Sequence, residues 1–149
     1  MDGTDRVRRA TADPINRRLD QERVERVAEL VGSSPEELGR AIDDLDRIWD
    51  VERVLEANAS TLMLVSLGLA RVHSPKWLLL STAVPAFLLQ HAIQGWCPPL
   101  PLFRRLGYRT QREIDEERYA LKALRGDFND LADRQNLPAA EGVLEAVES

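Results

Sequence analysis

The distribution of apolar and charged positions divides the chain into three regions. Residues 57–103 contain only two charged side chains, Arg71 and Lys76, and both lie in a short polar stretch that separates two apolar runs. The segments before and after this region are densely charged. Two apolar runs joined by a short polar turn are typical of a helical hairpin in an apolar environment.

The second apolar run, Trp77 to Cys97, has 21 residues and no formal charge. As a helix it would span about 31 Å, close to the ~30 Å thickness of the hydrocarbon core of a bilayer. Trp77 and Trp96 lie near its two ends, where aromatic anchors of membrane helices occur. Pro85 lies inside the run, a position that membrane helices tolerate. The run predicts a membrane-spanning helix, and the alternative is a buried helix of a soluble all-α domain.

The first apolar run is shorter. Only 14 uncharged residues separate Glu56 from Arg71, which gives about 21 Å of helix. A start at Leu55 and an Arg71 side chain that extends to the membrane surface would lengthen it enough to cross. We therefore predict an all-α protein in which residues 57–103 form a two-helix transmembrane hairpin flanked by cytoplasmic amphipathic helices.

The segment before the hairpin predicts a disordered region at 1–18 and amphipathic helices over 20–56. Residues 1–18 are polar, rich in arginine and aperiodic. A helix start is predicted at Ser34, where Pro35 occupies the first helical position and Glu37 completes a capping box. One apolar stripe follows, consisting of Leu38, Ile42, Leu45 and Trp49. This helix is expected to continue without a break into the hairpin, and its stripe to pack on the preceding helix or a second copy, or to dock a partner.

The segment after the hairpin predicts a juxtamembrane segment and cytoplasmic helix at 104–126 and an acidic mobile tail at 127–149. Prolines at 98, 99 and 101 end the second membrane helix. Arg104 and Arg105 follow within an apolar stretch, so we expect them to anchor the chain at the lipid headgroups. Thr110 and Glu113 form a second capping box, and Gly126 is a natural stop.

One stripe of the second membrane helix predicts the main helix-association seam. Its residues are spaced alternately three and four apart: Leu80, Ala83, Phe87, Gln90, Gln94 and Cys97. Such spacing places them along one face of a left-handed helix pair. The partner is a second copy of the chain or the first membrane helix, which offers Ser60, Ser66 and Gly68.

Composition and motifs narrow the function classes. The net charge of −5 argues against general nucleic-acid binding, because no excess of positive charge is available. One Cys and two His cannot build a closed zinc site, and no catalytic or phosphate-binding motif occurs. We therefore expect no cofactor and no enzymatic activity. His91 either hydrogen-bonds between helices or, in several copies, binds haem or a metal. Cys97 is either a structural thiol or a reactive one.

The hairpin resembles the YgaP-like inner-membrane domain family of bacteria. The resemblance rests on the Gly-x-Cys-Pro sequence at residues 95–98 and covers roughly residues 50–128. It implies a two-helix membrane domain that tends to dimerise and has no assigned activity of its own. Some members of that family are fused to a rhodanese-type sulfurtransferase, which this sequence does not contain.

Two functional hypotheses follow from the sequence. In the first, the chain is a non-enzymatic anchor or interaction module of the bacterial inner membrane, which forms a homodimer and recruits or organises an unidentified cytoplasmic protein. Basic residues concentrated after the second membrane helix place both termini in the cytoplasm. In the second, the protein assists sulfur or redox chemistry through Cys97.

Overall fold

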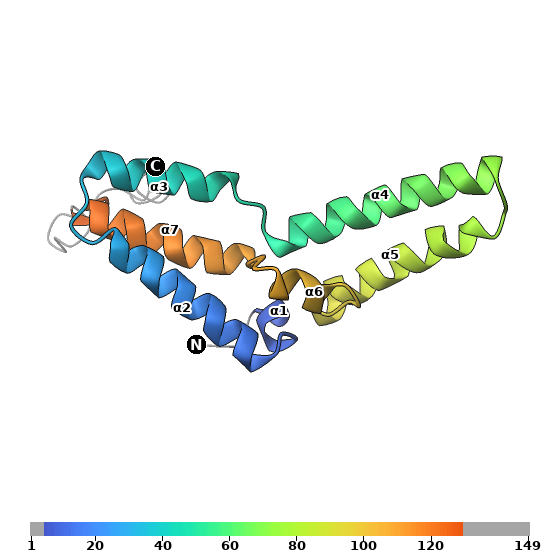
Figure 1. Cartoon of the computed structure of the whole chain (residues 1–149), viewed down its shortest axis with the longest axis horizontal. Helices are drawn as coiled ribbons and strands as arrows, with labels where there is room; N and C mark the ends of the chain where they lie inside the picture. The colour runs from blue at the N-terminus through green and yellow to red at the C-terminus, as the bar shows by residue number, and fades with distance from the viewer. Residues whose placement is uncertain (1–4, 130–149) are drawn as a thin grey trace, which may run out of the picture. The chain divides into compact units, whose positions relative to one another are not determined.

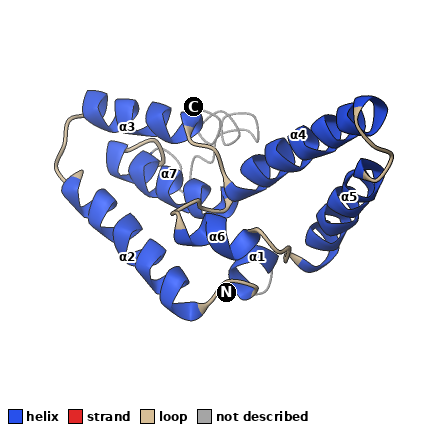
Figure 2. Ribbon diagram, turned by 45° about the vertical axis from the view of Figure 1, so that its right-hand side comes forward, coloured by secondary structure: helices blue, strands red, loops and turns tan. Residues whose placement is uncertain are grey.

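The computed structural model describes residues 5–129 and shows an all-α protein, as predicted, with no strand in that range (Figures 1 and 2). Its helices are α1 (Arg6–Arg9), α2 (Asp13–Glu29), α3 (Pro35–Arg47), α4 (Val51–Val72), α5 (Trp77–Gln94), α6 (Leu100–Arg105) and α7 (Gln111–Arg125). Most of the acidic tail predicted at 127–149 lies outside the described residues.

The described residues divide into two compact units. The hairpin unit comprises the described part of Met1–Gln21 together with Trp49–Glu113, and the three-helix unit comprises Glu22–Ile48 and the described residues from Ile114 onward. Helices α2 and α7 each contribute residues to both units.

The three-helix unit is built around the apolar stripe of α3. Leu38, Ile42 and Leu45 are buried together with Ile114 and Leu121 of α7, and apolar residues 27 and 30 pack against this core. The stripe therefore contacts the preceding helix, one of the predicted arrangements. The unit is also held by ion pairs between α2 or α3 and α7, namely Arg23–Glu116, Arg26–Glu117 and Arg118–Asp46.

The helix starts and stops in this part of the chain follow the predicted signals. Ser34 accepts a hydrogen bond from the backbone N–H of Glu37, whose carboxylate accepts one from the backbone N–H of Ser34, so the capping box is confirmed. Gly126 follows the end of α7 with φ at +97°, a conformation that glycine adopts without strain. The predicted stop of this helix is confirmed.

The prediction of a continuous helix from α3 into the hairpin was wrong. Helix α3 ends at Arg47, Ile48 is extended, and Asp50 begins α4 by accepting a hydrogen bond from the backbone N–H of Arg53. Trp49 lies in the connection with 45% of its surface exposed, so it does not continue the buried stripe. The N-cap of Asp50 competes with helical continuation because its carboxylate satisfies an N–H that the helix leaves unpaired.

Within the hairpin unit, α4 and α5 pack side by side and are joined by a short turn (Figure 1). Ser66 of α4 and Ser81 of α5 are buried, as expected where small side chains allow two helices to approach closely. Among the described helices, α5 alone is long and apolar enough to cross a membrane. Of the two helices expected to span a membrane, only α5 therefore has the length and apolar composition that spanning requires.

The prediction that residues 1–18 are disordered was also wrong for its described part. Helix α1 occupies Arg6–Arg9, capped by Asp5, and α2 already begins at Asp13. Val7 is buried in the core of the hairpin unit with Val51, Leu55 and Leu100. The segment is ordered because Val7, Arg6 and Arg8 contact residues that are far away in the sequence.

Candidate functional site

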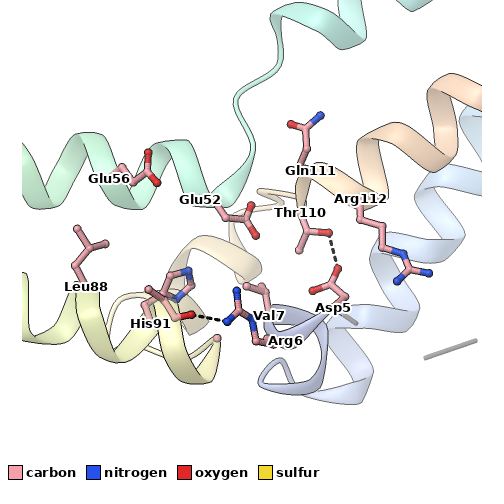
Figure 3. A pocket seen from close by; sticks show the side chains of 12 residues that line it. Asp5, Arg6, Val7, Glu52, Glu56, Leu88, His91, Thr110, Gln111 and Arg112 are labelled. Carbon is pink, nitrogen blue, oxygen red and sulfur yellow. Dashed lines mark hydrogen bonds between the residues drawn. The ribbon is translucent and has the colours of Figure 1, made fainter. Parts of the chain in front are cut away.

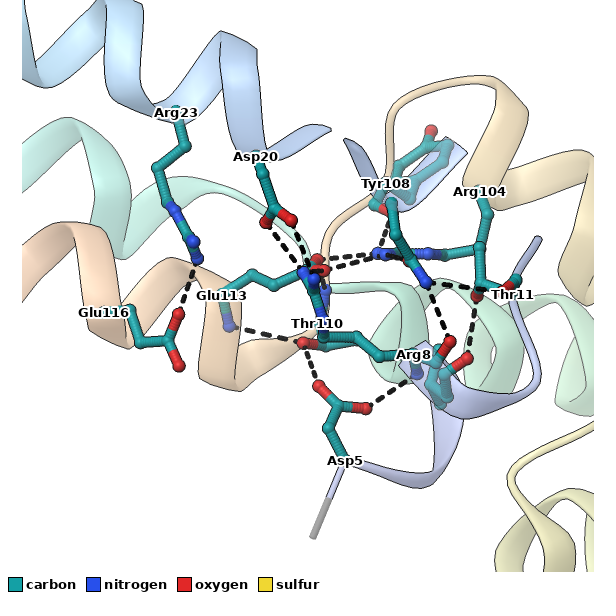
Figure 4. A network of polar contacts seen from close by, with 12 residues as sticks. Asp5, Arg8, Thr11, Asp20, Arg23, Arg104, Tyr108, Thr110, Glu113 and Glu116 are labelled. Atoms are coloured by element: carbon teal, nitrogen blue, oxygen red, sulfur yellow. Dashed lines mark hydrogen bonds and ion pairs between the residues drawn. The ribbon is translucent and has the colours of Figure 1, made fainter. Parts of the chain in front are cut away.

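A buried ion pair fixes the segments that surround the open end of the hairpin (Figure 4). The Arg104 guanidinium donates from both terminal nitrogens to the Glu113 carboxylate, at 2.7 and 2.8 Å. The side chains of Arg104 and Glu113 are 0% and 3% exposed. The same guanidinium donates to Asn16 Oδ1 and to the carbonyl of Tyr108, so it joins α2 and α6 to the start of α7.

This burial contradicts the prediction that Arg104 anchors the chain at lipid headgroups. A side chain with no exposed surface cannot reach a headgroup, and its charge is balanced by Glu113 inside the protein. Arg105, the second predicted anchor, is exposed, as that role requires.

Glu113 receives further donors that keep it ionised. Arg8 donates to it at 2.6 Å, and the backbone N–H of Thr110 donates at 2.9 Å. The backbone N–H of Glu113 donates in turn to Thr110 Oγ1, which confirms the second predicted capping box. Burial by itself would raise the pKa of Glu113, but the hydrogen bonds and positive charge of Arg104 outweigh it and hold the pKa below its ordinary value.

The N-terminal segment lies against the end of α5. Gly95 ends this helix with φ at +74°, and a Cβ atom at this position would lie 2.4–2.7 Å from Arg6 atoms. The guanidinium of Arg6 donates to the carbonyl of Ala92 in the last turn of α5. Glycine is therefore required both for the left-handed conformation and for the close approach of α1.

Beside these contacts lies a partly open cavity of about 690 Å³ in the hairpin unit (Figure 3). It is lined by residues from α1, from the first turns of α4, from the last turns of α5 and from the start of α7. Val7, Leu88, Ala92 and Gly95 supply an apolar wall. A volume of this size is in the range of small-molecule sites.

Glu52 is the most perturbed carboxyl group at the cavity. Its Oε2 atom is buried and has no hydrogen-bond partner in the described part of the protein. Burial, together with the negative charges of Asp50 and Asp5, raises the pKa of Glu52 to about 7, although backbone hydrogen bonds oppose the shift. A carboxyl group with a pKa near neutrality inside a cavity is a candidate functional residue.

His91 extends into the same cavity from α5 (Figure 3). Its Nδ1 atom is buried without a hydrogen-bond partner among the described residues, so this nitrogen does not make the interhelical hydrogen bond expected from the sequence. The described residues contain no group of three or more Cys, His, Asp or Glu side chains placed to hold a metal ion.

The predicted seam is divided by the end of α5. Leu80 and Phe87 are 38% and 45% exposed, Gln94 is exposed, and Ala83 and Gln90 are half-buried. This face is therefore partly open in the single chain. Cys97 lies beyond the helix, and its thiol is in a residue only 4% exposed, within the core formed by Val51, Leu55 and Leu100. Its assignment to the seam was wrong, because Gly95 turns the backbone out of the helix.

The two predicted tryptophan anchors lie at the two ends of α5, Trp77 as its first residue and Trp96 just after its last. Trp77 begins the helix and donates from Nε1 to His73 Nδ1 at 3.2 Å, with the two rings edge to face. Trp96 follows the helix and is 39% exposed. Both positions remain compatible with the predicted role.

Sequence reasoning singled out His91 but missed Arg6, Glu52 and Glu113 as parts of this site. In the sequence, Glu52 is an acidic residue in the first turn of a helix, which is a common and favourable position for a carboxylate. No local pattern indicates that it is buried against α1. In comparisons with known proteins, no family model, curated protein or solved structure matches the chain.

Proposed function

We propose that the protein is a membrane anchor, in which the α4–α5 hairpin inserts into a lipid bilayer and carries the three-helix unit. The observation that supports this most strongly is the exposure of α5. Only 6% of its apolar window is buried inside the protein. A core helix of a soluble domain would have most of that surface covered.

The exposed apolar surface continues onto α4. More than half of the exposed large apolar side chains in the described residues lie on these two helices: Leu62, Leu64, Val65, Leu67, Val72, Leu78, Leu79, Leu80, Phe87, Leu89 and Ile93. A water-soluble monomer rarely exposes a continuous apolar surface of this extent. Hydrocarbon chains of a bilayer would cover it without leaving backbone groups unpaired, because both segments are helical.

The membrane-inserted part would consist of residues 57–72 and of α5. The shorter α4 segment reaches the far surface if Arg71 and Lys76 extend toward the headgroups there. Because a hairpin returns the chain to the side it came from, both flanking segments lie on one side, and the arginines after α5 favour the cytoplasm of a bacterium.

The remaining sequence-based expectations belong to this proposal. They are membership of the YgaP-like inner-membrane family, a non-enzymatic role without a cofactor, and homodimerisation through the open part of the seam at Leu80, Ala83, Phe87, Gln90 and Gln94. A cytoplasmic protein partner would then bind the three-helix unit. Burial of Cys97 in the core gives no support to the alternative role in sulfur or redox chemistry.

Alkaline extraction tests the proposal. Membranes from bacteria that express the full chain are washed at alkaline pH and high salt, and we expect the protein to remain in the membrane pellet. Phe87→Arg places a charge near the middle of α5 at a cost of about 2.5–3.5 kcal/mol and should shift part of the protein out of the membrane. Val24→Arg, at an exposed apolar position of α2, is the matched control. Recovery of wild type as a soluble, monodisperse species would contradict insertion.

A further inference from the structure

Two residues that line the cavity at the open end of the hairpin each have one buried side-chain polar atom without a hydrogen-bond partner among the described residues. Glu52 Oε2 and His91 Nδ1 are buried and unpaired within the described residues, and they come from different helices. A buried polar atom without a partner costs free energy, which a ligand with suitable donors would recover. The neighbouring polar groups are already engaged: Asp5 accepts from Thr110, and Arg6 donates to Ala92.

The charges around the cavity indicate what kind of donor fits. The acidic residues at 5, 52 and 56 and the arginines at 6 and 112 are among the residues that line the same space. A ligand that carries a positive and a negative group side by side would match both sets. Val7 and Leu88 leave an apolar wall for a short carbon chain between them.

We propose that this cavity binds a zwitterionic primary amine, with its ammonium group donating to Glu52 and His91 and its anionic group near Arg6 and Arg112. A primary ammonium group supplies three N–H donors, whereas a quaternary ammonium group supplies none. The ethanolamine phosphodiester group has this chemistry. It occurs both as the headgroup of a phospholipid and as a free molecule.

Binding should be linked to the protonation of Glu52. Burial keeps the pKa of this carboxyl near neutrality, and a bound ammonium group would favour the ionised form. The other titratable or charged groups that face it are Asp5 and Arg6 from the α1 segment, Asp50 and Glu56 around the start of α4, His91 from α5, and Arg112 from α7. Affinity should therefore decrease as the pH falls through the pKa of Glu52.

The test is calorimetric titration of the full-length protein in phosphatidylcholine nanodiscs with glycerophosphoethanolamine or glycerophosphocholine. These probes differ in the N–H donors and have the same phosphodiester. We expect the ethanolamine probe to bind about tenfold more tightly, and Glu52→Gln and His91→Phe each to remove most of that preference. Glu25→Gln, an exposed substitution in α2, should leave it unchanged.

A second readout separates recognition from a structural role of Glu52. For wild type, the affinity for the ethanolamine probe should fall between about pH 8 and about pH 6, and for Glu52→Gln it should be flat. Nanodiscs that contain phosphatidylethanolamine identify the source. If they abolish binding of the soluble probe, the site takes the lipid headgroup, and if they do not, it takes the free molecule.

Equal affinity for the two probes, absence of binding, or wild-type behaviour of Glu52→Gln would overturn the proposal. These results are independent of membrane anchoring, because the same titration can be performed in detergent micelles. If the protein is recovered as a soluble species in the alkaline extraction but still prefers the ethanolamine probe, the membrane-anchor proposal is contradicted and the ligand proposal is not.

Discussion

Replacing Glu113 by Gln is expected to lower the free energy of unfolding by about 3–5 kcal/mol, the largest effect we expect from a single substitution in the described part of the protein. Gln has nearly the same shape and can still complete the capping box at Thr110. What it removes is the negative charge that balances the Arg104 guanidinium, which has no exposed surface. An uncompensated buried charge has lost its hydration without gaining a partner. The measurement is urea-induced unfolding of the full chain in detergent micelles.

Glu37→Gln is the matched control for this experiment. Ser34 and Glu37 form the same capping box at the start of α3, but both are exposed. Without a buried arginine to compensate, Glu37→Gln should lower the free energy of unfolding far less than Glu113→Gln does. Adding Arg104→Met to Glu113→Gln should recover part of the loss, because the unpaired guanidinium is then gone. Similar losses for the two single variants would mean that the buried pair contributes little.

The charge of Glu113 also makes the stability of the protein depend on pH in the acid range. Its pKa in the folded protein is below the ordinary value of 4.5. A depressed carboxyl pKa contributes stability that is fully present above the unfolded-state value and is lost as the pH falls through the folded-state value. In wild type this contribution should disappear below about pH 4.5 and be absent from Glu113→Gln at every pH.

Replacing Glu52 by Gln is expected to raise the free energy of unfolding, whereas replacing Glu113 lowers it. The effect also falls in a different pH range. The folded-state pKa of Glu52 is raised from 4.5 to about 7. Wild type therefore loses stability as the pH rises from the unfolded-state value through the folded-state value, because ionisation is easier in the unfolded chain. Gln cannot ionise, so the stability of the variant relative to wild type should increase as the pH rises through this interval.

The expected gain at about pH 8 is about 1–2 kcal/mol larger than at about pH 5, after allowance for the partial exposure of Glu52 to solvent. Unfolding at the two pH values measures it, with Glu25→Gln as the exposed control. If the two variants show the same pH dependence, Glu52 is not held in a desolvated state by α1 and α5.

The features predicted correctly from the sequence are those that neighbouring residues determine. Ser34 and Thr110 begin helices because each lies three residues before a glutamate, and Gly126 follows a helix end because it adopts a positive φ. The stripe of Leu38, Ile42 and Leu45 reflects helical periodicity. The low charge of residues 57–103 likewise indicated two paired helices.

The features that were missed depend on residues far apart in the sequence. In the sequence, Arg104 is a basic residue that follows a predicted membrane helix. Its burial depends on its contacts with Glu113 and with Asn16, which lies 88 positions away. Arg8 belongs to a segment that looks disordered, yet it pairs with Asp20 and Glu113. The cavity beside Glu52 exists only because α1 lies against the end of α5.

The most direct measurement of the central claim is the rate at which a water-soluble maleimide labels α4 in intact membranes. Leu64→Cys in the middle of α4 and Val24→Cys in α2 replace large apolar residues that are 68% and 65% exposed in the protein alone. Both are made with Cys97 replaced by Ala. If the hairpin is inserted, Leu64→Cys should react about a hundredfold more slowly than Val24→Cys, because hydrocarbon excludes the reagent and disfavours the thiolate. The difference should vanish after the membranes are dissolved in sodium dodecyl sulfate, because the hydrocarbon barrier is then gone. Equal rates in intact membranes would place α4 in water and contradict the membrane hairpin.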